Sequence, residues 1–167
     1  VIEPECQNIN LSEHYITVSY DGEQEILLDI DGNYLNSSYG GYILDDDNAK
    51  TIPVWSGGCY GAIDQTGETL VDCYYDNYQT EEGWISLYND DAYQDGILIN
   101  PDGEIVCENY VRYFTDNDTE YITAWDEKGT DEVDESIAVS GALLDKSGTV
   151  IQTFDDRYNV GKFVKVR

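Results

Sequence analysis

A four-residue turn signature, Asx-x-x-Gly, recurs along the chain and constrains the fold more than any other feature of the sequence. Its glycines are separated by 35, 36 and 45 residues, and an aliphatic residue precedes each Asx. A unit repeated at such a period cannot bury its own apolar face, so neighbouring units must stack. The copies run from Asp29 to Gly32, from Asp64 to Gly67, from Asn100 to Gly103 and from Asp145 to Gly148.

The copy "NPDG" (100–103) shows the chemistry of the signature most clearly. Type I turns favour Asx at the first position, Pro at the second and Gly at the fourth. In a three-residue hairpin loop the Gly takes the left-handed conformation, and the Asx side chain accepts a hydrogen bond from the backbone two residues on. Because Asn100 replaces the carboxylate in one copy, we interpret Asp64 as a turn residue and not as a catalytic group.

The segments between the turns are predicted to be strands. The sequences "YITVSY" (15–20), "WISLYN" (84–89) and "YITAWD" (121–126) alternate with period two and are rich in β-branched and aromatic residues. We therefore predict an all-β fold of tandem antiparallel hairpins or three-stranded units of about 35–45 residues. The units are expected to stack as an open arc or a propeller-like array.

The whole chain, residues 1–167, is predicted to form a single β-repeat domain of about four repeats. Val1-Ile2 resembles the strand that follows a turn, because it precedes Tyr15 by the same interval that separates Leu70 from Trp84. On this reading the array starts in the middle of a repeat, and we expect the sequence to be an excerpt of a longer chain.

The segment "YGAIDQTGETLVDCYYD" (60–76), followed by Gly83-Trp84, resembles the repeat of the bacterial WG β-repeat family. The segment "SGALLDKSGTVIQTFDD" (140–156), followed by Gly161, resembles it nearly as well. The Trp-Gly dipeptide that names the family is absent, and Tyr60-Gly61 is its nearest counterpart. The resemblance implies a non-enzymatic protein that is extracytoplasmic or surface-associated, in a family mostly without a defined ligand.

The charge of the chain argues against several classes of partner. Eight Lys and Arg residues stand against 35 Asp and Glu residues, which gives a formal charge of −27. Nucleic acids and anionic membrane surfaces are bound through clustered basic residues, so neither is an expected partner. The sequence contains no run of 18 apolar residues, so no membrane-inserted helix is predicted. The 15 tyrosines, the absence of methionine and the few lysines suggest a secreted or cell-surface protein. The expected partner is an unidentified protein or glycan.

No catalytic constellation is evident. His14 is the only histidine, so the sequence predicts neither a catalytic triad nor a structural zinc site. Paired carboxylates of a glycan-active enzyme are an alternative, but acidic residues are too abundant to identify them. We predict no cofactor; a weak calcium site is the alternative, because "DIDGN" (29–33) begins like an oxygen-rich loop but lacks the later Glu of an EF-hand.

Recurrent aromatic residues are the best binding candidates. An aromatic residue followed by Ile or Val alternates with the turns, and these aromatics are expected at equivalent places on successive strands. They are able to stack on sugar rings or to hold an extended peptide, but we favour a packed aromatic ladder within the array. The main prediction is thus a non-catalytic binding or scaffold module, and the alternative is a carbohydrate-binding module. The candidates are Tyr15, Tyr42, Trp84, Tyr121, Trp125 and Phe163.

Cys59 and Cys73 are predicted to form a disulfide. If the loop after Asp64 has three residues and the hairpin register is regular, these cysteines lie directly opposite each other, at a distance that permits a bond. The remaining cysteines, Cys6 and Cys107, either pair with each other or stay free. The alternative is four free thiols.

Overall fold

The computed structural model describes residues 6–20, 25–44, 50–90, 96–110, 112–115, 120–126 and 140–154. Within these ranges the chain contains sixteen strands and no helix. The strands form four antiparallel sheets of four strands each, and in every sheet the strands pair in chain order. The predicted all-β array of stacked antiparallel repeats is therefore confirmed.

The sheets are numbered here in chain order. Sheet 1 contains β1 (Asn8–Leu11), β2 (Tyr15–Ser19), β3 (Ile26–Asp29) and β4 (Tyr34–Asn36). Sheet 2 contains β5 (Gly41–Tyr42), β6 (Thr51–Ser56), β7 (Cys59–Asp64) and β8 (Thr69–Tyr75). Sheet 3 contains β9 (Asn77–Glu81), β10 (Trp84–Tyr88), β11 (Gly96–Ile99) and β12 (Ile105–Tyr110). Sheet 4 contains β13 (Arg112–Thr115), β14 (Tyr121–Asp126), β15 (Ser140–Asp145) and β16 (Val150–Phe154).

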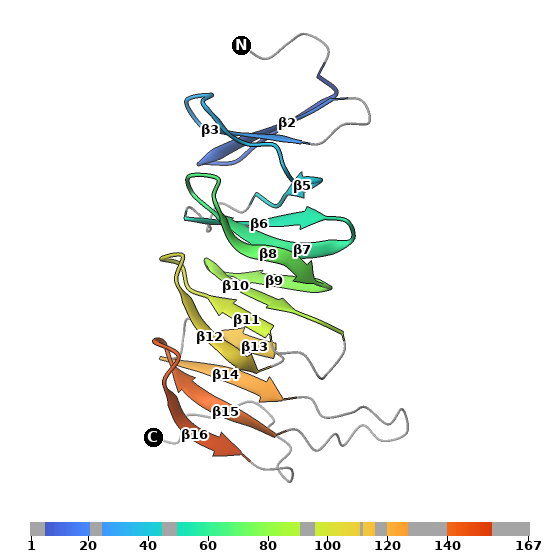
Figure 1. Cartoon of the computed structure of the whole chain (residues 1–167). Helices are drawn as coiled ribbons and strands as arrows, with labels where there is room; N and C mark the ends of the chain where they lie inside the picture. Colours follow the sequence, from blue (N-terminus) through green and yellow to red (C-terminus); the bar gives the residue numbers. More distant parts are fainter. Residues whose placement is uncertain are drawn as a thin grey trace.

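The sheets are stacked in chain order, so that sheets 1 and 4 lie at opposite ends of an open column (Figure 1). Each Asx-x-x-Gly turn joins the third strand of a sheet to the fourth, and all four turns lie along the same side of the column (Figure 1). In each turn the Gly amide donates to the carbonyl of the Asx residue. The glycines have φ values of +82° to +87°, which glycine adopts without strain.

A register shift follows every turn. In sheet 2, Ile63 pairs with Thr69, but the next residue, Ala62, pairs with Val71. Shifts at the corresponding position occur in sheets 1, 3 and 4. Such a β-bulge places an extra residue in one strand and increases its local twist. The bulge is thus a constant part of the repeat.

The bulges make the predicted Cys59–Cys73 disulfide wrong. A second shift in sheet 2 places Tyr75 opposite Tyr60, so the regular register that would align the two cysteines is lost. All four cysteines are free thiols. Burial raises the pKa of the Cys73 thiol, and the nearby Cys59 and Asp72 raise it further.

The hydrophobic core lies between the sheets. One face of each interior sheet, the leading face, packs on the sheet before it, and the opposite trailing face packs on the sheet after it. At the first interface the trailing face contributes Tyr15 and Leu27, and the leading face contributes Ile52, Val54 and Ile63. Equivalent positions build the other two interfaces, so most of the apolar burial depends on stacking.

Each sheet has four strands, whereas the sequence pattern predicts two or three. The additional strand is the first one of each sheet. Strand β9, "NYQTE", is polar and lacks the apolar alternation that identifies a strand in sequence. Strand β1, "NINL", alternates polar and apolar residues, but over only four residues, all of them exposed. The expected strand at Val1-Ile2, and with it the expected start in the middle of a repeat, lies outside the described residues.

Candidate functional site

The structure separates the aromatic residues of the predicted row. Tyr15 and Trp84 occupy equivalent positions on the trailing faces of sheets 1 and 3, and they are only 5% and 6% exposed. Tyr121 has the same place in sheet 4 but is 45% exposed. The side chain of Trp125 and all of Phe163 lie outside the described residues. The row is therefore largely interior.

Tyr42 does not belong to this series. It lies in β5, whereas the equivalent position in sheet 2 is Thr51, which pairs with Asp64 as Tyr15 pairs with Asp29. The error arises because Tyr42-Ile43 repeats the aromatic-aliphatic pattern by chance on a different strand. Tyr42 is buried, and its hydroxyl donates to Asn36 Oδ1 at 2.9 Å across the first interface. Burial raises the pKa of Tyr42.

The side chains of the Asx turn residues accept hydrogen bonds from within their own loops. Oδ1 of Asp64 accepts hydrogen bonds from the amides of Thr66 and Glu68. Oδ1 of Asn100 accepts the equivalent bonds from the amides of Asp102 and Glu104. Partial burial raises the pKa of Asp64, but hydrogen bonds from the Thr66 hydroxyl, at 2.7 Å, and from the Glu68 and Thr66 amides outweigh it and lower the pKa below its ordinary value. A carboxylate held in this way favours its charged form and is a poor proton donor.

The other two turn carboxylates have similar contacts. The side chain and then the backbone of Asn33 donate to Asp29 and lower its pKa. The Ser147 hydroxyl, followed by the Thr149 amide, lowers the pKa of Asp145. Both carboxylate oxygens of Asp29 are thus engaged within "DIDGN". In the described part of the chain, no group of three or more His, Cys, Asp or Glu residues is arranged to hold a metal ion.

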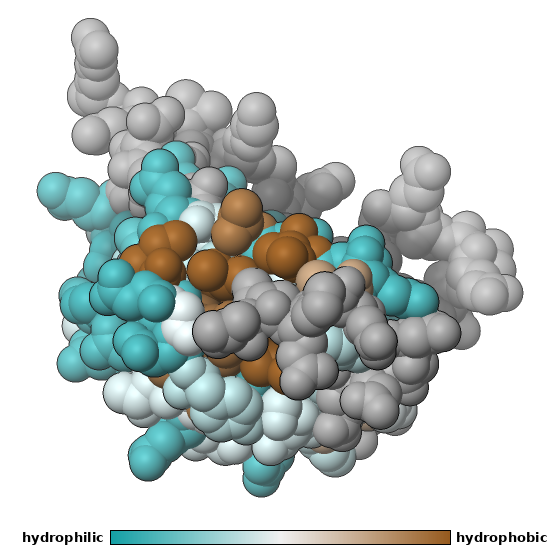
Figure 2. Space-filling model, turned by 90° about the horizontal axis from the view of Figure 1, so that it is seen from above, coloured by the Kyte–Doolittle hydropathy of each residue, from teal (hydrophilic) through white to brown (hydrophobic). Residues whose placement is uncertain are grey.

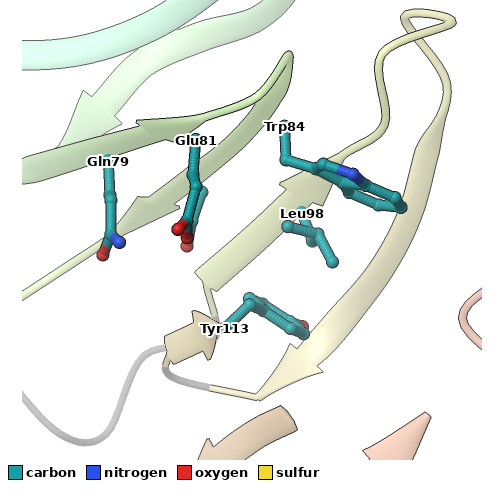
Figure 3. A pocket seen from close by; sticks show the side chains of 6 residues that line it. Gln79, Glu81, Trp84, Leu98 and Tyr113 are labelled. Carbon is teal, nitrogen blue, oxygen red and sulfur yellow. The ribbon is translucent and has the colours of Figure 1, made fainter. Parts of the chain in front are cut away.

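A small cavity lies between sheets 3 and 4. Gln79, Glu81, Trp84, Leu98 and Tyr113 converge on it (Figure 3), and its volume is about 10 Å³. The Ser86 hydroxyl also lines it, and this buried oxygen has no hydrogen-bond partner among the residues that the structure describes. A space of this size holds at most one water molecule, which would satisfy the hydroxyl. The cavity is a structural feature and is too small for a ligand.

A larger, open hollow of about 270 Å³ lies at the opposite end of the sheet 2 strands from their Asx turn at Asp64. Trp55 in β6, Tyr60 in β7 and Tyr78 in β9 form its aromatic walls. Glu25, which precedes β3, contributes a carboxylate. The hollow therefore combines residues of three consecutive sheets.

The β6–β7 hairpin positions two of these aromatics. Its two-residue loop, Gly57-Gly58, has φ values of +63° and +90°, as a type I′ turn requires. Trp55 and Tyr60 consequently face each other directly across the hairpin. The sequence "WSGGCY" contained this signal, since Gly-Gly between two strand segments predicts a tight hairpin with flanking residues paired.

The Trp55 ring lies against the backbone at Gly40. A Cβ atom at Gly40 would come within 2.8 Å of the ring, so a glycine is needed for this contact. Trp55 nevertheless remains 41% exposed. Tyr60 and Tyr78 join the adjoining sheets with ring centroids 4.8 Å apart. The hollow thus has a partly exposed indole surface beside a pair of phenol rings.

The carboxylate of Glu25 is anchored at the rim of the hollow. Its Oε2 accepts a hydrogen bond from the Tyr42 amide at 3.2 Å. The second oxygen and the tyrosine hydroxyls supply polar contacts beside the aromatic surfaces. Glu25 is the one carboxylate among the described residues that line the hollow. The geometry suits binding by stacking and hydrogen bonding.

Comparisons with known proteins give no family. No family model matches the sequence, and no curated protein matches it. Among solved structures, the chain is similar to "KlHsv2 with loop 6CD replaced by a Gly-Ser linker", with 10% identity, a TM-score of 0.42, and coverage of 92% of this chain and 54% of that one. BamB from Moraxella catarrhalis is similar at 16% identity and a TM-score of 0.37, over 88% of this chain and 49% of that chain.

The tricorn protease is similar at 13% identity and a TM-score of 0.38, over 90% of this chain and 16% of that one. The chain thus spans about half the length of the first two proteins. In the described ranges there is no helix of the length and apolarity needed to cross a bilayer.

Proposed function

We propose that this protein is a non-catalytic binding module of the cell surface or extracellular space, and that its ligand occupies the hollow at Trp55. One observation carries the proposal: Trp55 is a large aromatic residue that stays 41% exposed in a concave site lined by further aromatics. Ligand sites are typically concave, with aromatic walls and a few fixed polar groups. The acidic, Tyr-rich composition supports the location.

A glycan is the ligand class that fits this hollow best. The apolar face of a sugar ring buries surface against an indole ring, and its hydroxyls form hydrogen bonds with carboxylate and phenol groups. Trp55 supplies the platform, and Glu25, Tyr60 and Tyr78 supply the polar partners. The hollow is open and shallow, which suits one or two residues of an extended chain.

A basic peptide is the second candidate, because the chain carries a formal charge of −27. Lysine and arginine side chains are attracted to aromatic faces and to a carboxylate such as Glu25. This interaction is screened by salt, whereas sugar stacking is nearly independent of it. Salt dependence therefore distinguishes the two ligand classes.

A glycan array, followed by calorimetric titration of each hit, tests the proposal. Trp55→Ala is expected to weaken binding at least tenfold, equivalent to about 1.4 kcal/mol. Tyr74→Ala is the matched control, since Tyr74 is an exposed aromatic of the same sheet outside the hollow. The proposal fails if no glycan or basic peptide binds, or if the two substitutions weaken binding equally.

A further inference from the structure

The three sheets that build the hollow contain almost no lysine or arginine. Residues 1–111, which include sheets 1, 2 and 3, carry a single lysine, Lys50, and no arginine, although acidic residues occur throughout. The Lys50 ammonium group donates to the carboxylate of Asp102. This pair lies at the Asx-turn end of the sheet 2 strands, because the neighbouring Thr51 pairs with Asp64. The one lysine of this region is therefore engaged at the opposite end from the hollow.

Glu25 is held at the rim of the hollow by a neutral hydrogen bond. Its Oε2 accepts from the Tyr42 amide, and a Cβ at Gly41 would lie 3.7 Å from the same oxygen. The described lining residues include no Lys, Arg or His. Residues 21–24 and 45–49 lie outside the described residues, and their sequences, "DGEQ" and "DDDNA", contain no basic residue. The sequence and the described lining thus supply no cation to neutralise the Glu25 carboxylate.

The aromatic rings of the hollow add to its attraction for a cation. The faces of Trp and Tyr rings are electronegative and attract an ammonium group within about 6 Å of the ring centre. Trp55 exposes part of its indole ring, and Tyr60 and Tyr78 lie with their ring centroids 4.8 Å apart. The same chemistry occurs elsewhere in the chain, where Lys146 Nζ lies 5.1 Å from the centre of the Trp84 ring. A carboxylate beside three aromatic rings favours a cation that also has an apolar surface.

The hollow differs in kind from the hydrophobic surface at the sheet 1 end of the column. Figure 2 views that end and shows hydrophobic residues clustered near its centre, with hydrophilic residues around them. Ile9 and Leu11 of β1 are exposed. Apolar side chains alone do not indicate a ligand, whereas aromatic rings next to a charged group indicate a class of ligand.

We propose that the glycan bound in the hollow carries free amines, as glucosamine residues do, and that Glu25 selects the ammonium group. This inference rests on the proposed function of the hollow as a glycan site and adds its charge selectivity. The sugar ring stacks on Trp55, and the ammonium group contacts the Glu25 carboxylate and the rings of Tyr60 and Tyr78. Because the amine is attached directly to the sugar ring, stacking fixes its position and little conformational entropy is lost.

Other ligands meet less favourable electrostatics or a larger loss of entropy. An N-acetylated amine has no charge, and the carboxylate of a uronic acid is repelled by Glu25 and by the formal charge of −27. A peptide lysine carries the same ammonium group on a flexible stem, whose immobilisation costs conformational entropy. We therefore expect a glycan with free amines to bind more tightly than its acetylated form, an acidic glycan or a basic peptide.

Calorimetric titration with two oligosaccharides that differ only in acetylation tests the inference. The ligands are the glucosamine hexamer and the N-acetylglucosamine hexamer, at about pH 6, where carboxylates and amines are ordinarily both charged. The unmodified chain is expected to bind the free-amine hexamer roughly fivefold to tenfold more tightly, as one partly exposed ion pair permits. This preference should decrease as NaCl is added, because salt screens the charges. The comparison does not depend on any variant.

Glu25→Gln, with Glu68→Gln as its matched control, separates Glu25 from the overall charge. Each substitution removes one negative charge, but Glu68 is exposed beside the Asx turn of sheet 2, at the far end from the hollow. Glutamine retains an oxygen that can accept from the Tyr42 amide, and thermal melting followed by circular dichroism verifies that both variants are folded. Glu25→Gln should reduce the preference for the free-amine hexamer to less than about twofold, whereas Glu68→Gln should retain it.

The remaining outcomes separate this inference from the proposed function. If both hexamers bind equally and Trp55→Ala weakens both, the hollow is a glycan site without charge selectivity, so the proposed function stands and the inference is wrong. If Glu25→Gln and Glu68→Gln reduce the preference equally, only the overall charge acts and the inference is wrong. If neither hexamer binds, the inference is wrong, and the glycan array alone decides the proposed function.

A hexalysine peptide is the third ligand in the titration. Salt screens an ammonium contact in a cationic glycan as it does in a basic peptide, so a direct comparison of affinities distinguishes these two ligands. Weaker binding of hexalysine than of the glucosamine hexamer is the expected result. Tighter binding of hexalysine would identify a basic peptide as the ligand and overturn the inference.

Discussion

The two edges of the sheet 2 strands have opposite characters. At one edge, the Asx turn at Asp64 and Gly67 has counterparts in the other three sheets, with the same hydrogen bonds and the same left-handed glycine. At the other edge, Trp55, Tyr60 and Tyr78 form an open hollow between sheets. A feature needed to stack every unit must recur, whereas a ligand site needs to occur only once. The turns thus serve the architecture, and the hollow is where we propose that the ligand binds.

The largest expected effect comes from Gly67→Ala, with Gly32→Ala as its matched control. Both positions have a left-handed backbone, which costs alanine about 1 kcal/mol. At Gly67 the new Cβ would also clash with the Leu35 backbone at 2.7 Å, whereas at Gly32 it meets open space. Overpacking adds roughly 2 kcal/mol, so urea unfolding should show a loss of about 3 kcal/mol for Gly67→Ala and about 1 kcal/mol for Gly32→Ala. Equal losses would show that the turn does not contribute to stacking.

Gly40→Ala tests the other edge. The added methyl group would come within 2.8 Å of the Trp55 ring and must displace it. Because Gly40 lacks a left-handed φ and the ring is free to move outward, we expect less than about 1 kcal/mol of lost stability. Calorimetric titration should show binding weakened by roughly fivefold to tenfold, or about 1 kcal/mol. Gly41→Ala is the control, since its Cβ would make ordinary contacts of 3.7 Å or more.

The smallest expected effect is on the pH dependence of stability. Hydrogen bonds lower the pKa values of Asp29, Asp64 and Asp145 below 3.8 in the folded chain. A lowered pKa stabilises the folded state above the unfolded value, and this stabilisation is lost as the pH falls through the folded value. The triple variant Asp29→Asn, Asp64→Asn, Asp145→Asn should therefore show a shallower loss of stability below about pH 4 than the unmodified chain.

Asn100 supplies the internal control for that prediction. Its amide oxygen already makes the turn contacts without charge, so the triple variant should keep the fold at neutral pH. Thermal melting temperatures measured from neutral pH to below pH 4 for both proteins check the expectation. Identical profiles would mean that the turn carboxylates do not titrate differently in the folded and unfolded chains.

The turns and the main strands could be predicted from the sequence because their signals are local. Asx, Gly and period-two alternation each reflect the conformation of a few consecutive residues. The bulge after each turn has no comparable signal, and for this reason the Cys59–Cys73 pairing was predicted in the wrong register. Thr51 was missed as the counterpart of Tyr15 because equivalence within the repeat is fixed by strand pairing and not by residue type.

The hollow could not be predicted as a site, because it depends on three sheets. Trp55 and Tyr60 are paired by a local hairpin, but Tyr78 and Glu25 come from the adjoining sheets. Their proximity follows from the stacking geometry, which a single strand pattern does not contain. The predicted aromatic row contained real repeat positions, but stacking buries Tyr15 and Trp84.

The most direct test of the division between the two edges is a paired measurement of stability and ligand affinity on Trp55→Ala and Asp64→Ala. Asp64→Ala removes the acceptor of the turn hydrogen bonds and should lower the free energy of unfolding by about 1 kcal/mol while leaving the dissociation constant unchanged. Trp55→Ala should weaken ligand binding at least tenfold, or about 1.4 kcal/mol, with little change in unfolding. The account is contradicted if Asp64→Ala weakens binding as much as Trp55→Ala does.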